Sequence, residues 1–284
     1  MQTVHELDVL RKSVTKLRDG GASVALVPTM GALHDGHLTL VRRAREACDH
    51  VVASIFVNPT QFGPNEDLDA YPRQLESDAN MLEGEGCALL WAPDVEAMYP
   101  EDFASSISVS GVSDGLCGAD RPGHFDGVAT VVCKLFNQVQ PDMAFFGEKD
   151  FQQLAVIRTM ARDLDLTRPH AHQIIGVPTV REPDGLAMSS RNRYLSQSDR
   201  AAAATLPRAM KEAIAAIGAG AQVGPTLSAL ESSLIEAGFS SVDYAALADA
   251  RSLAPLTENS NAPARLLVAA RIGGTRLIDN MGVN

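Results

Sequence analysis

The chain has few basic residues for its size. Lys and Arg number 24 against 35 Asp and Glu, which gives a formal net charge of −11 and a sequence pI near 5.1. An acidic surface repels phosphate backbones and anionic membranes at long range, so nucleic acid is not expected as a partner. Any site for an anionic substrate must therefore gather its cations locally.

The chain also lacks the patterns of a disulfide-rich, zinc-binding or membrane protein. Its cysteines are widely spaced and form no CxxC pair, which argues against a zinc site or a disulfide framework. No apolar run approaches the length that spans a bilayer, and residues 1–14 lack the apolar core of a signal peptide. We therefore expect a cytoplasmic protein. The cysteines are Cys48, Cys87, Cys117 and Cys133.

What is present is enough material for a core: 284 residues, 45% of them hydrophobic. Up to about residue 179, β-rich apolar runs alternate with helical stretches. This alternation predicts a Rossmann-like parallel sheet with helices on both faces, and ligands at the carboxyl ends of its strands. The predicted strands are residues 23–28, 51–57, 87–91, 143–146 and 172–177, and the predicted helices are residues 37–48, 73–85, 127–139 and 151–164.

From about residue 180 the pattern changes. A polar, turn-rich segment leads into an Ala-rich helix and a second amphipathic helix, followed by two β-like stretches. We interpret residues 1–179 as a Rossmann-like ligand-binding domain and residues 180–284 as a smaller α+β domain that acts as a lid. The predicted helices are residues 198–218 and 225–238, and the β-like stretches are residues 241–247 and 264–272.

The strongest local motif is PTMGALHDGH, residues 28–37, which directly follows the first predicted strand. Gly31 and Gly36 permit close backbone approach, and His34 and His37 flank the start of a helix. Free N–H groups and the helix dipole favour anions there, and imidazole donors can stabilise charge that develops at phosphorus. The alternatives are a helix cap with two exposed histidines, or a two-histidine metal site, for which no third ligand of suitable spacing is apparent.

A second motif, SIFVNPTQFG at residues 54–63, follows the second predicted strand. The amides of Asn58 and Gln61 both donate and accept hydrogen bonds, which suits hydroxyls and a carboxylate. The simpler alternative is an Asn-Pro turn with a surface glutamine. Asp67, Asp69 and Tyr71 lie in a loop beyond it, which is either a flap, a contributor to a divalent metal site, or a solvated acidic loop.

A third motif, FFGEKDFQQ at residues 145–153, has the pattern of a strand, a turn and a helix. Lys149 is a point charge at the helix N-terminus, suited to a β- or γ-phosphate. Asp150 either caps the helix or holds metal-bound water. Gln153, three residues further on, lies on the same helical face as Asp150.

A fourth motif, MSSRN at residues 188–192, lies in the turn-rich segment. The hydroxyls of Ser189 and Ser190 followed by Arg191 form a compact set for an anion. The segment resembles the KMSKS-type loop that closes over ATP phosphates, with Arg191 in place of a lysine, although SSRN alone is a common loop composition. A further segment, residues 120–128, carries Arg121 and His124, which either line the site or pack at a subunit contact.

Taken together, these motifs resemble the pantothenate synthetase (pantoate–β-alanine ligase) family of the HxGH nucleotidylyltransferase superfamily. The resemblance covers essentially the whole chain, with PTMGALHDGH, SIFVNPTQF, RPGHFDGV, FFGEKDFQQL and MSSRNRYLS in the family's order. It implies a two-step reaction in coenzyme A precursor biosynthesis. ATP and pantoate, with Mg²⁺, give pantoyl adenylate and pyrophosphate, and the amine of β-alanine then displaces AMP to give pantothenate.

The resemblance also implies the roles of individual residues and a homodimer. Catalysis falls to His34, His37, Lys149 and Arg191. Gln61 and Gln153 bind pantoate, Gln61 also reaches β-alanine, and Asn58 belongs to the same substrate site. The implied ATP site comprises Met30, Gly31, Ala32, Leu33, His34, Asp35, Gly36, His37, Gly147, Glu148, Lys149, Asp150, Val180, Met188, Ser189, Ser190 and Arg191.

Two other functions compete with this interpretation. A nucleotidylyltransferase that transfers AMP or CMP to a phosphate ester would share the HxGH motif, but it is expected to carry more cations in place of the amides of Gln61 and Gln153. A non-catalytic nucleotide-sensing protein is expected to lack at least one of the four catalytic side chains, and all four are present.

Overall fold

The computed structural model describes residues 1–64, 66–258 and 262–283. The chain divides into two compact units. Unit 1 comprises Met1–Ser110, Arg121–Glu148 and Gln153–Pro178, and unit 2 comprises Gly111–Asp120, Lys149–Gln152 and Thr179–Asn284. The predicted domains 1–179 and 180–284 remain a prediction, because compactness does not test which segments fold or move independently.

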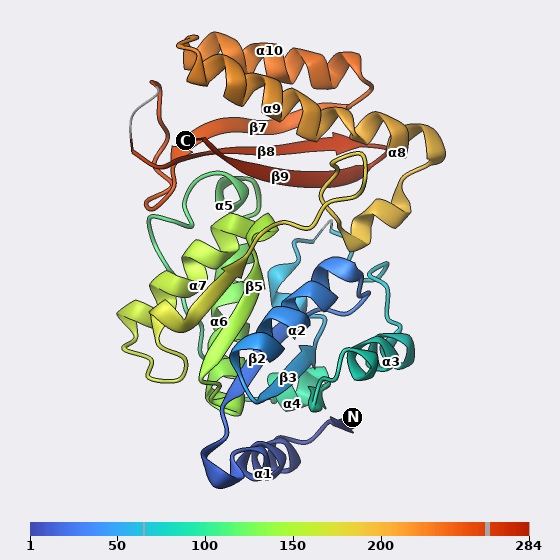
Figure 1. Ribbon diagram of the computed structural model, residues 1–284, viewed down its shortest axis with the longest axis vertical. Coiled ribbons are helices and arrows are strands. Elements are labelled where there is room, and N and C mark those ends of the chain that lie inside the picture. The colour runs from blue at the N-terminus through green and yellow to red at the C-terminus, as the bar shows by residue number, and fades with distance from the viewer. Residues whose placement is uncertain (65, 259–261, 284) are drawn as a thin grey trace. The chain divides into compact units, whose positions relative to one another are not determined.

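Unit 1 is built on a parallel sheet, as the alternating pattern predicts. Within the described residues this sheet has six strands in the order β1-β4-β3-β2-β5-β6, all in parallel register (Figure 1). The fold class is therefore confirmed. The strand β1 was not predicted, because three residues are too short for a recognisable alternation. The strands are β1 Gln2–Val4, β2 Val24–Thr29, β3 His50–Ile55, β4 Leu89–Trp91, β5 Met143–Gly147 and β6 Ile174–Val177.

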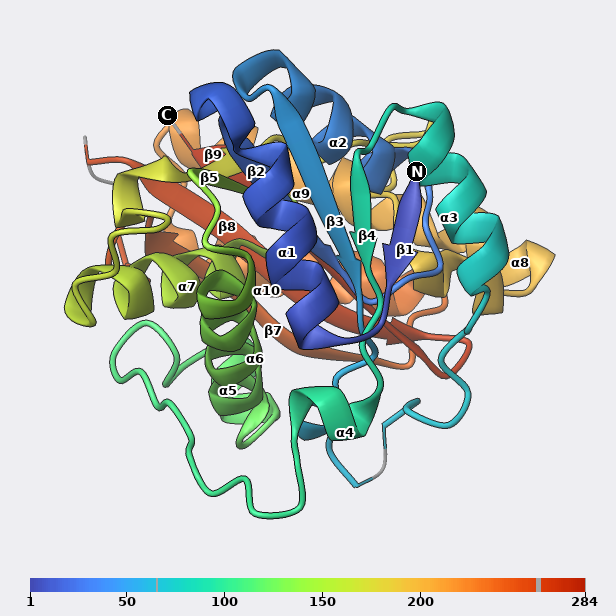
Figure 2. The ribbon, with the colours of Figure 1, turned by 90° about the horizontal axis from the view of Figure 1, so that it is seen from below.

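Helices cover both faces of this sheet. On one face, α2 buries Leu40, Val41 and Ala44 in a cluster that includes Leu82 of α3. On the other face lie α1 and α6, in front of the strands in Figure 2, and the buried Trp91 donates from Nε1 to Oε1 of Gln138 in α6 at 3.0 Å. The helices of unit 1 are α1 Leu7–Leu17, α2 Asp35–Ala47, α3 Leu75–Gly84, α4 Val95–Met98 and α6 His124–Val139. The helix α7 Phe151–Asp163 belongs to unit 1 from Gln153 onward, and its first two residues belong to unit 2.

Unit 2 combines an antiparallel three-stranded sheet with helices. The strands β7 Ser241–Asp249, β8 Ala264–Ile272 and β9 Thr275–Val283 pair in sequence order, and α9 and α10 cover one face (Figure 1). Gly273 and Gly274 both have positive φ and form the two-residue hairpin turn between β8 and β9, for which glycine is favoured. The helices are α5 Cys117–Asp120, α8 Gln197–Ala203, α9 Thr205–Gly218 and α10 Val223–Glu236.

The structure corrects two details of the predicted C-terminal part. The Ala-rich stretch is two helices that meet at Ala204, so the single helix over 198–218 was wrong. Pro207 has no N–H to donate to the carbonyl of residue 203, and a proline in the first turn of a new helix is tolerated. The strand β9 was also missed, since its sequence TRLIDNMGV places the polar pair Asp279 and Asn280 where a core strand is expected to be apolar.

Candidate active site

The turn between β2 and α2 is shaped by a buried carboxylate. Gly31 and Ala32 have φ values of 84° and 52°, and a Cβ on Gly31 would lie 3.0 Å from Oδ2 of Asp78. Asp78 of α3 is fully buried and accepts from the backbone N–H of Ala32 at 2.8 Å and of Leu33 at 3.0 Å. Asp78 therefore holds the turn that precedes the two histidines. It was not predicted, because no local motif marks it.

The two histidines of the HxGH motif form a reciprocal cap at the start of α2. Nδ1 of His34 accepts from the N–H of Gly36 at 3.2 Å, and Nδ1 of His37 accepts from the N–H of His34 at 3.3 Å. An Nδ1 that accepts carries no proton, so in each neutral imidazole the proton is on Nε2. The ring centroids are 4.1 Å apart. The cap therefore makes both rings Nε2–H donors at the positive end of a helix.

Asn58 fixes the side chain of Gln61. Asn58 is buried, and its Nδ2 donates to Oε1 of Gln61 at 3.2 Å and to the carbonyl of Gly127 at 3.1 Å. Its Oδ1 accepts from the hydroxyl of Tyr99 at 2.8 Å. Because Oε1 of Gln61 is an acceptor here, Nε2 is the donor end, and it lies against Sδ of Met30. The first two motifs therefore meet within unit 1.

Gly127 permits the short turn η2 Pro59–Gln61 to lie directly against α6. A Cβ at this position would be 2.4 Å from the carbonyl oxygen of Thr60 and 2.8 Å from the backbone nitrogen of Gln61. Real Cβ atoms do not approach a backbone this closely, so any side chain at 127 would displace the turn. Gly127, the second glycine of RPGHFDGV, is thus required because it packs against the turn that carries Gln61.

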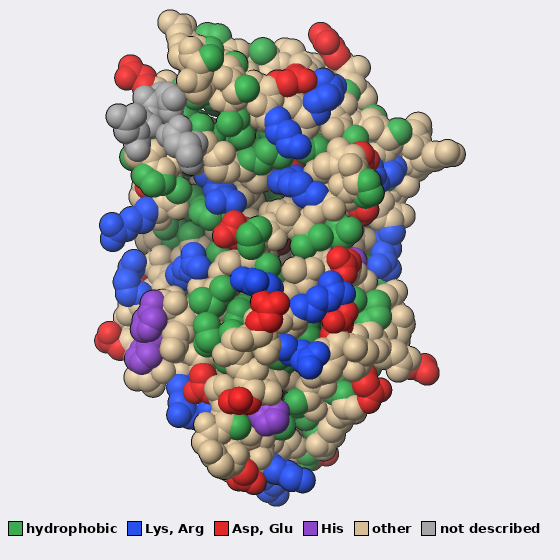
Figure 3. Space-filling view, viewed as in Figure 1, with side chains coloured by type: hydrophobic (Ala, Val, Ile, Leu, Met, Phe, Trp, Pro, Cys, Tyr) green, Lys and Arg blue, Asp and Glu red, His purple; other side chains and the backbone are tan. Residues whose placement is uncertain are grey.

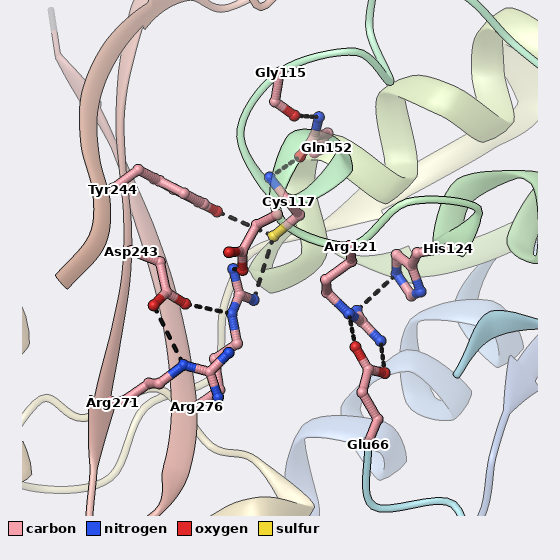
Figure 4. A network of polar contacts seen from close by, with 11 residues as sticks. Glu66, Gly115, Cys117, Arg121, His124, Gln152, Asp243, Tyr244, Arg271 and Arg276 are labelled. Atoms are coloured by element: carbon pink, nitrogen blue, oxygen red, sulfur yellow. Dashed lines mark hydrogen bonds and ion pairs between the residues drawn. The ribbon is translucent and has the colours of Figure 1, made fainter. Parts of the chain in front are cut away.

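The other two marked residues of that motif contact the same turn. Arg121 binds the carboxylate of Glu66 through two hydrogen bonds of 2.6 Å (Figure 4). Arg121 and His124 both donate to the carbonyl oxygen of Gln61, at 3.2 and 2.8 Å. Burial alone would raise the pKa of Glu66, but the hydrogen bonds and charge of Arg121 outweigh it and lower that pKa. Glu66 is therefore held as a carboxylate.

Unit 2 holds the cationic motifs through β9. Asn280 donates from Nδ2 to the carbonyl of Lys149 at 2.8 Å, and Asp279 accepts from both terminal nitrogens of Arg181 at 2.7 and 2.9 Å. Arg181 pairs with Ala187 in an isolated antiparallel bridge, and the next residue, Met188, donates from its N–H to the carbonyl of Val180 at 3.0 Å. Two neighbouring residues of the missed strand thus anchor both the Lys149 and the Ser189–Arg191 segments.

The remaining predicted site residues lie partly in unit 1 and partly in unit 2. Ser189 caps the short 3₁₀ helix η5 Ser190–Tyr194 by accepting from the N–H of Arg191 at 3.3 Å. Lys149 lies 3.7 Å from the carboxylate of Asp150 in η3 Glu148–Asp150. Asp35 and Gly36 open α2, Gly147 ends β5, and Gln153 is partly buried on α7. Glu148 belongs with Gly147 and Gln153 to unit 1, whereas Asp150 and Val180 belong to unit 2.

A separate network in unit 2 secures residues 111–120. Oε1 of Gln152 accepts from the N–H of Cys117 at 3.0 Å, and Nε2 donates to the carbonyl of Gly115 at 2.7 Å (Figure 4). Sγ of Cys117 lies 3.1 Å from the hydroxyl of Tyr244. Burial and this thiol raise the pKa of Tyr244. The network holds residues 111–120 in place. No sequence motif marks the residues that form it, so the network was not predicted.

Across residues 1–64, 66–258 and 262–283, each helix is too short or too polar to span a bilayer, and no group of three or more His, Cys, Asp or Glu side chains is placed to hold a metal ion. Basic and acidic side chains are interspersed over the face that Figure 3 shows.

A parallel sheet with two imidazole donors capping the helix after β2 is the arrangement expected of an HxGH nucleotidylyltransferase-type enzyme. Comparison with known proteins defines the family. Residues 2–282 match the model of the family described as pantoate-beta-alanine ligase. The chain is 67% identical to the pantothenate synthetase of Novosphingobium aromaticivorans over 283 residues, covering 100% of this chain and 99% of the relative.

Solved structures agree with this result. The pantothenate synthetase of Thermus thermophilus has a TM-score of 0.92 and 49% identity, covering 100% of this chain and 99% of that one. The pantoate-beta-alanine ligase of Francisella tularensis, described as complexed with beta-gamma ATP and beta-alanine, has a TM-score of 0.83 and 32% identity, covering 99% and 97%. The chain belongs to the pantoate–β-alanine ligase family, and it is accordingly an ATP-dependent ligase.

The role of Asp78 can be tested by stability. Asp78→Ala is expected to lower the free energy of unfolding by about 2–4 kcal/mol, because two buried N–H groups lose their acceptor. Glu76→Ala, on the exposed side of the same helix, should change it by no more than about 0.5 kcal/mol. Urea denaturation measures both, and equal effects of the two substitutions would contradict the role given to Asp78.

The close approach at Gly127 gives a second prediction. Gly127→Ala should destabilise the protein by about 1–3 kcal/mol, because the new methyl group must displace the backbone of Thr60 and Gln61. The matched control is Gly224→Ala, a helical glycine with open space around its Cβ position, where alanine should be neutral or stabilising. Thermal unfolding measures both variants, and a neutral Gly127→Ala would show that the turn does not depend on this contact.

Proposed function

We propose that this chain condenses pantoate with β-alanine through a pantoyl adenylate, in the synthesis of a coenzyme A precursor. The observation that carries the proposal is that the first two motifs lie against each other within unit 1: the oriented amide of Gln61 contacts Met30, and the segment that starts at Met30 leads to two Nε2–H imidazole donors at the start of α2. Donors of this kind suit a phosphate in transfer, and an oriented amide suits a hydroxy acid.

In the first step, a carboxylate oxygen of pantoate attacks the α-phosphorus of ATP. A bond forms between that oxygen and phosphorus, and the bond from phosphorus to the bridging oxygen breaks, which releases pyrophosphate. The carboxylate is already a nucleophile, so no protein nucleophile is required. The enzyme must align two anions, and alignment contributes about 7–11 kcal/mol in favourable cases. His34 and His37 stabilise the charge that accumulates at the phosphoryl oxygens.

The substrate residues are assigned by the chemistry of their side chains. Gln61 and Gln153 bind the hydroxyls and carboxylate of pantoate, and Gln61 also meets β-alanine. Asn58 acts mainly by holding Gln61. In unit 1 we assign to ATP the residues Met30, Gly31, Ala32, Leu33, His34, Asp35, Gly36, His37, Gly147 and Glu148. In unit 2 we assign to it Lys149, Asp150, Val180, Met188, Ser189, Ser190 and Arg191.

Mg²⁺ fits the residues assigned to ATP as an ion that the nucleotide carries. It is commonly held by substrate phosphates and one or two carboxylates, which does not require a cluster of protein ligands. Within the described residues no such cluster occurs, and Asp150 supplies a partly exposed carboxylate beside Lys149. We propose Asp150 as the protein's contribution. When bound, the ion would neutralise part of the phosphate charge.

In the second step, the uncharged amine of β-alanine attacks the acyl carbon of the adenylate. The carbon–nitrogen bond forms, the carbon–oxygen bond to the phosphate breaks, AMP leaves with that oxygen, and the nitrogen releases one proton to solvent. Exclusion of water protects the adenylate until the amine arrives.

We also propose a cytoplasmic homodimer. Cys48, Cys87, Cys117 and Cys133 are all buried free thiols, which fits a reducing compartment. The dimer rests on the family resemblance, and sedimentation of the purified protein at several concentrations measures it directly.

Pyrophosphate release tests the function. With ATP and Mg²⁺, pantoate should elicit a single turnover of pyrophosphate in the absence of β-alanine, and continuous turnover to AMP and pantothenate in its presence. Release that ignores pantoate and responds to a phosphate ester would instead identify a nucleotidylyltransferase.

Two charge-stabilising residues give a quantitative prediction. His37→Ala and Lys149→Ala should each lower the rate of adenylate formation by about 100-fold or more, the usual effect of removing one preorganised donor. Lys211→Ala removes an exposed lysine elsewhere and should leave the rate unchanged. Rapid-quench measurement of the pyrophosphate burst separates this step from product release. Near-normal bursts in either variant would refute that residue's role.

A further inference from the structure

The motif RPGHFDGV contains two polar residues, Arg121 and His124, that the reaction described above does not use. Arg121 directly follows α5, and His124 is the first residue of α6. Between them, Gly123 has a φ of 79°, a left-handed conformation that favours glycine and turns the chain into the helix. Both side chains contact the carbonyl of Gln61. Figure 4 shows the contacts of Arg121 with His124 and with Glu66.

Arg121 uses every nitrogen of its guanidinium within the protein. Nε and Nη2 each donate to a different oxygen of Glu66 at 2.6 Å, Nη1 donates to Nε2 of His124 at 2.9 Å, and Nη2 also reaches the carbonyl of Gln61 at 3.2 Å. The paired geometry with a carboxylate is the strong form of this interaction. The side chain is about four-fifths buried, with 18% exposed. Arg121 is thus committed to the protein and not to a substrate carboxylate.

The contact with Arg121 determines which nitrogen of His124 carries the proton. A guanidinium only donates, so Nε2 of His124 is an acceptor and Nδ1 carries the hydrogen. Nδ1 is 2.8 Å from the carbonyl oxygen of Gln61 and donates to it. A continuous chain of hydrogen bonds therefore runs from Glu66 through Arg121 and His124 to the backbone of Gln61.

The chain of contacts fixes the segment from Gln61 to Glu66 at both ends. Gln61 precedes Glu66 by five residues, and both are bound to the start of α6, one through its carbonyl and one through its carboxylate. The side chain of Gln61 is oriented separately by Asn58. The backbone and the side-chain amide of the same residue are thus fixed by different partners.

We infer that Glu66, Arg121 and His124 form a clamp that positions Gln61 for the acid substrate, with His124 Nδ1–H as the contact that matters most. The inference rests on the proposed function for its substrate. The three residues are positioning residues: they act on pantoate through Gln61 and leave nucleotide binding alone.

Two near-isosteres of histidine separate the two ring nitrogens. In His124→Asn the amide nitrogen takes the place of Nδ1 and keeps the donor to Gln61, whereas His124→Gln keeps an acceptor near Nε2 and loses that donor. His124→Gln should raise the KM for pantoate about tenfold, the effect of one lost hydrogen bond, with the Kd for ATP alone within twofold of wild type. His124→Asn should remain within threefold on both measures.

The control is Arg162→Ala, which removes an exposed arginine of the same unit and should leave both constants unchanged. Equal KM values for the Asn and Gln variants, or a parallel loss of ATP affinity, would overturn the inference. Amide hydrogen exchange gives a readout that needs no substrate: residues 60–62 should exchange faster in His124→Gln than in His124→Asn, with α2 unaffected. If wild type ignores pantoate, the proposed function fails while this exchange still decides whether the clamp exists.

Discussion

The mutual repulsion of two anions is the constraint on which this site depends. A carboxylate must meet a triphosphate on a protein whose own formal net charge is −11. The long-range field of such a protein opposes both substrates. The charge that stabilises them must therefore be local and fixed in place. We propose that the chain meets this requirement with two imidazoles whose Nδ1 atoms are already occupied by the cap of α2, and with the cations Lys149 and Arg191.

Fixing the side chains of the candidate site requires buried polar residues that hydrogen-bond within the protein. Asp78 holds the turn before the histidines, Asn58 holds the amide of Gln61, and Asp279 holds the segment that leads to the Ser189–Arg191 loop. Each is nearly or fully buried, and each has strong hydrogen-bond partners, as a buried polar group requires. Asn58 lies within the motif that it orients, whereas Asp78 and Asp279 come from distant parts of the sequence.

The difference between motif residues and the buried residues that hold them explains what was predictable from sequence. The parallel sheet followed from strand–helix alternation, and the motifs next to strands were visible because their residues are consecutive. Asp78 and Asn280 were not visible, because their importance arises only when α3 and β9 are brought to the turns they hold. Gly127 belonged to a recognised motif, but the need for glycine there comes from the close approach of α6 to the backbone of Thr60, which the sequence does not show. The break at Ala204 was decided by one proline within an otherwise continuous helical pattern.

In the proposed reaction, the acid's own carboxylate oxygen attacks the α-phosphorus, and the protein supplies alignment and donors but no nucleophile. Pantoate labelled with ¹⁸O in both carboxylate oxygens tests it most directly. After turnover with β-alanine, the account predicts one ¹⁸O in the phosphate of AMP and one in the amide carbonyl of pantothenate, as measured by mass spectrometry. AMP free of ¹⁸O would contradict the account, because the acid would then have been activated without forming an adenylate.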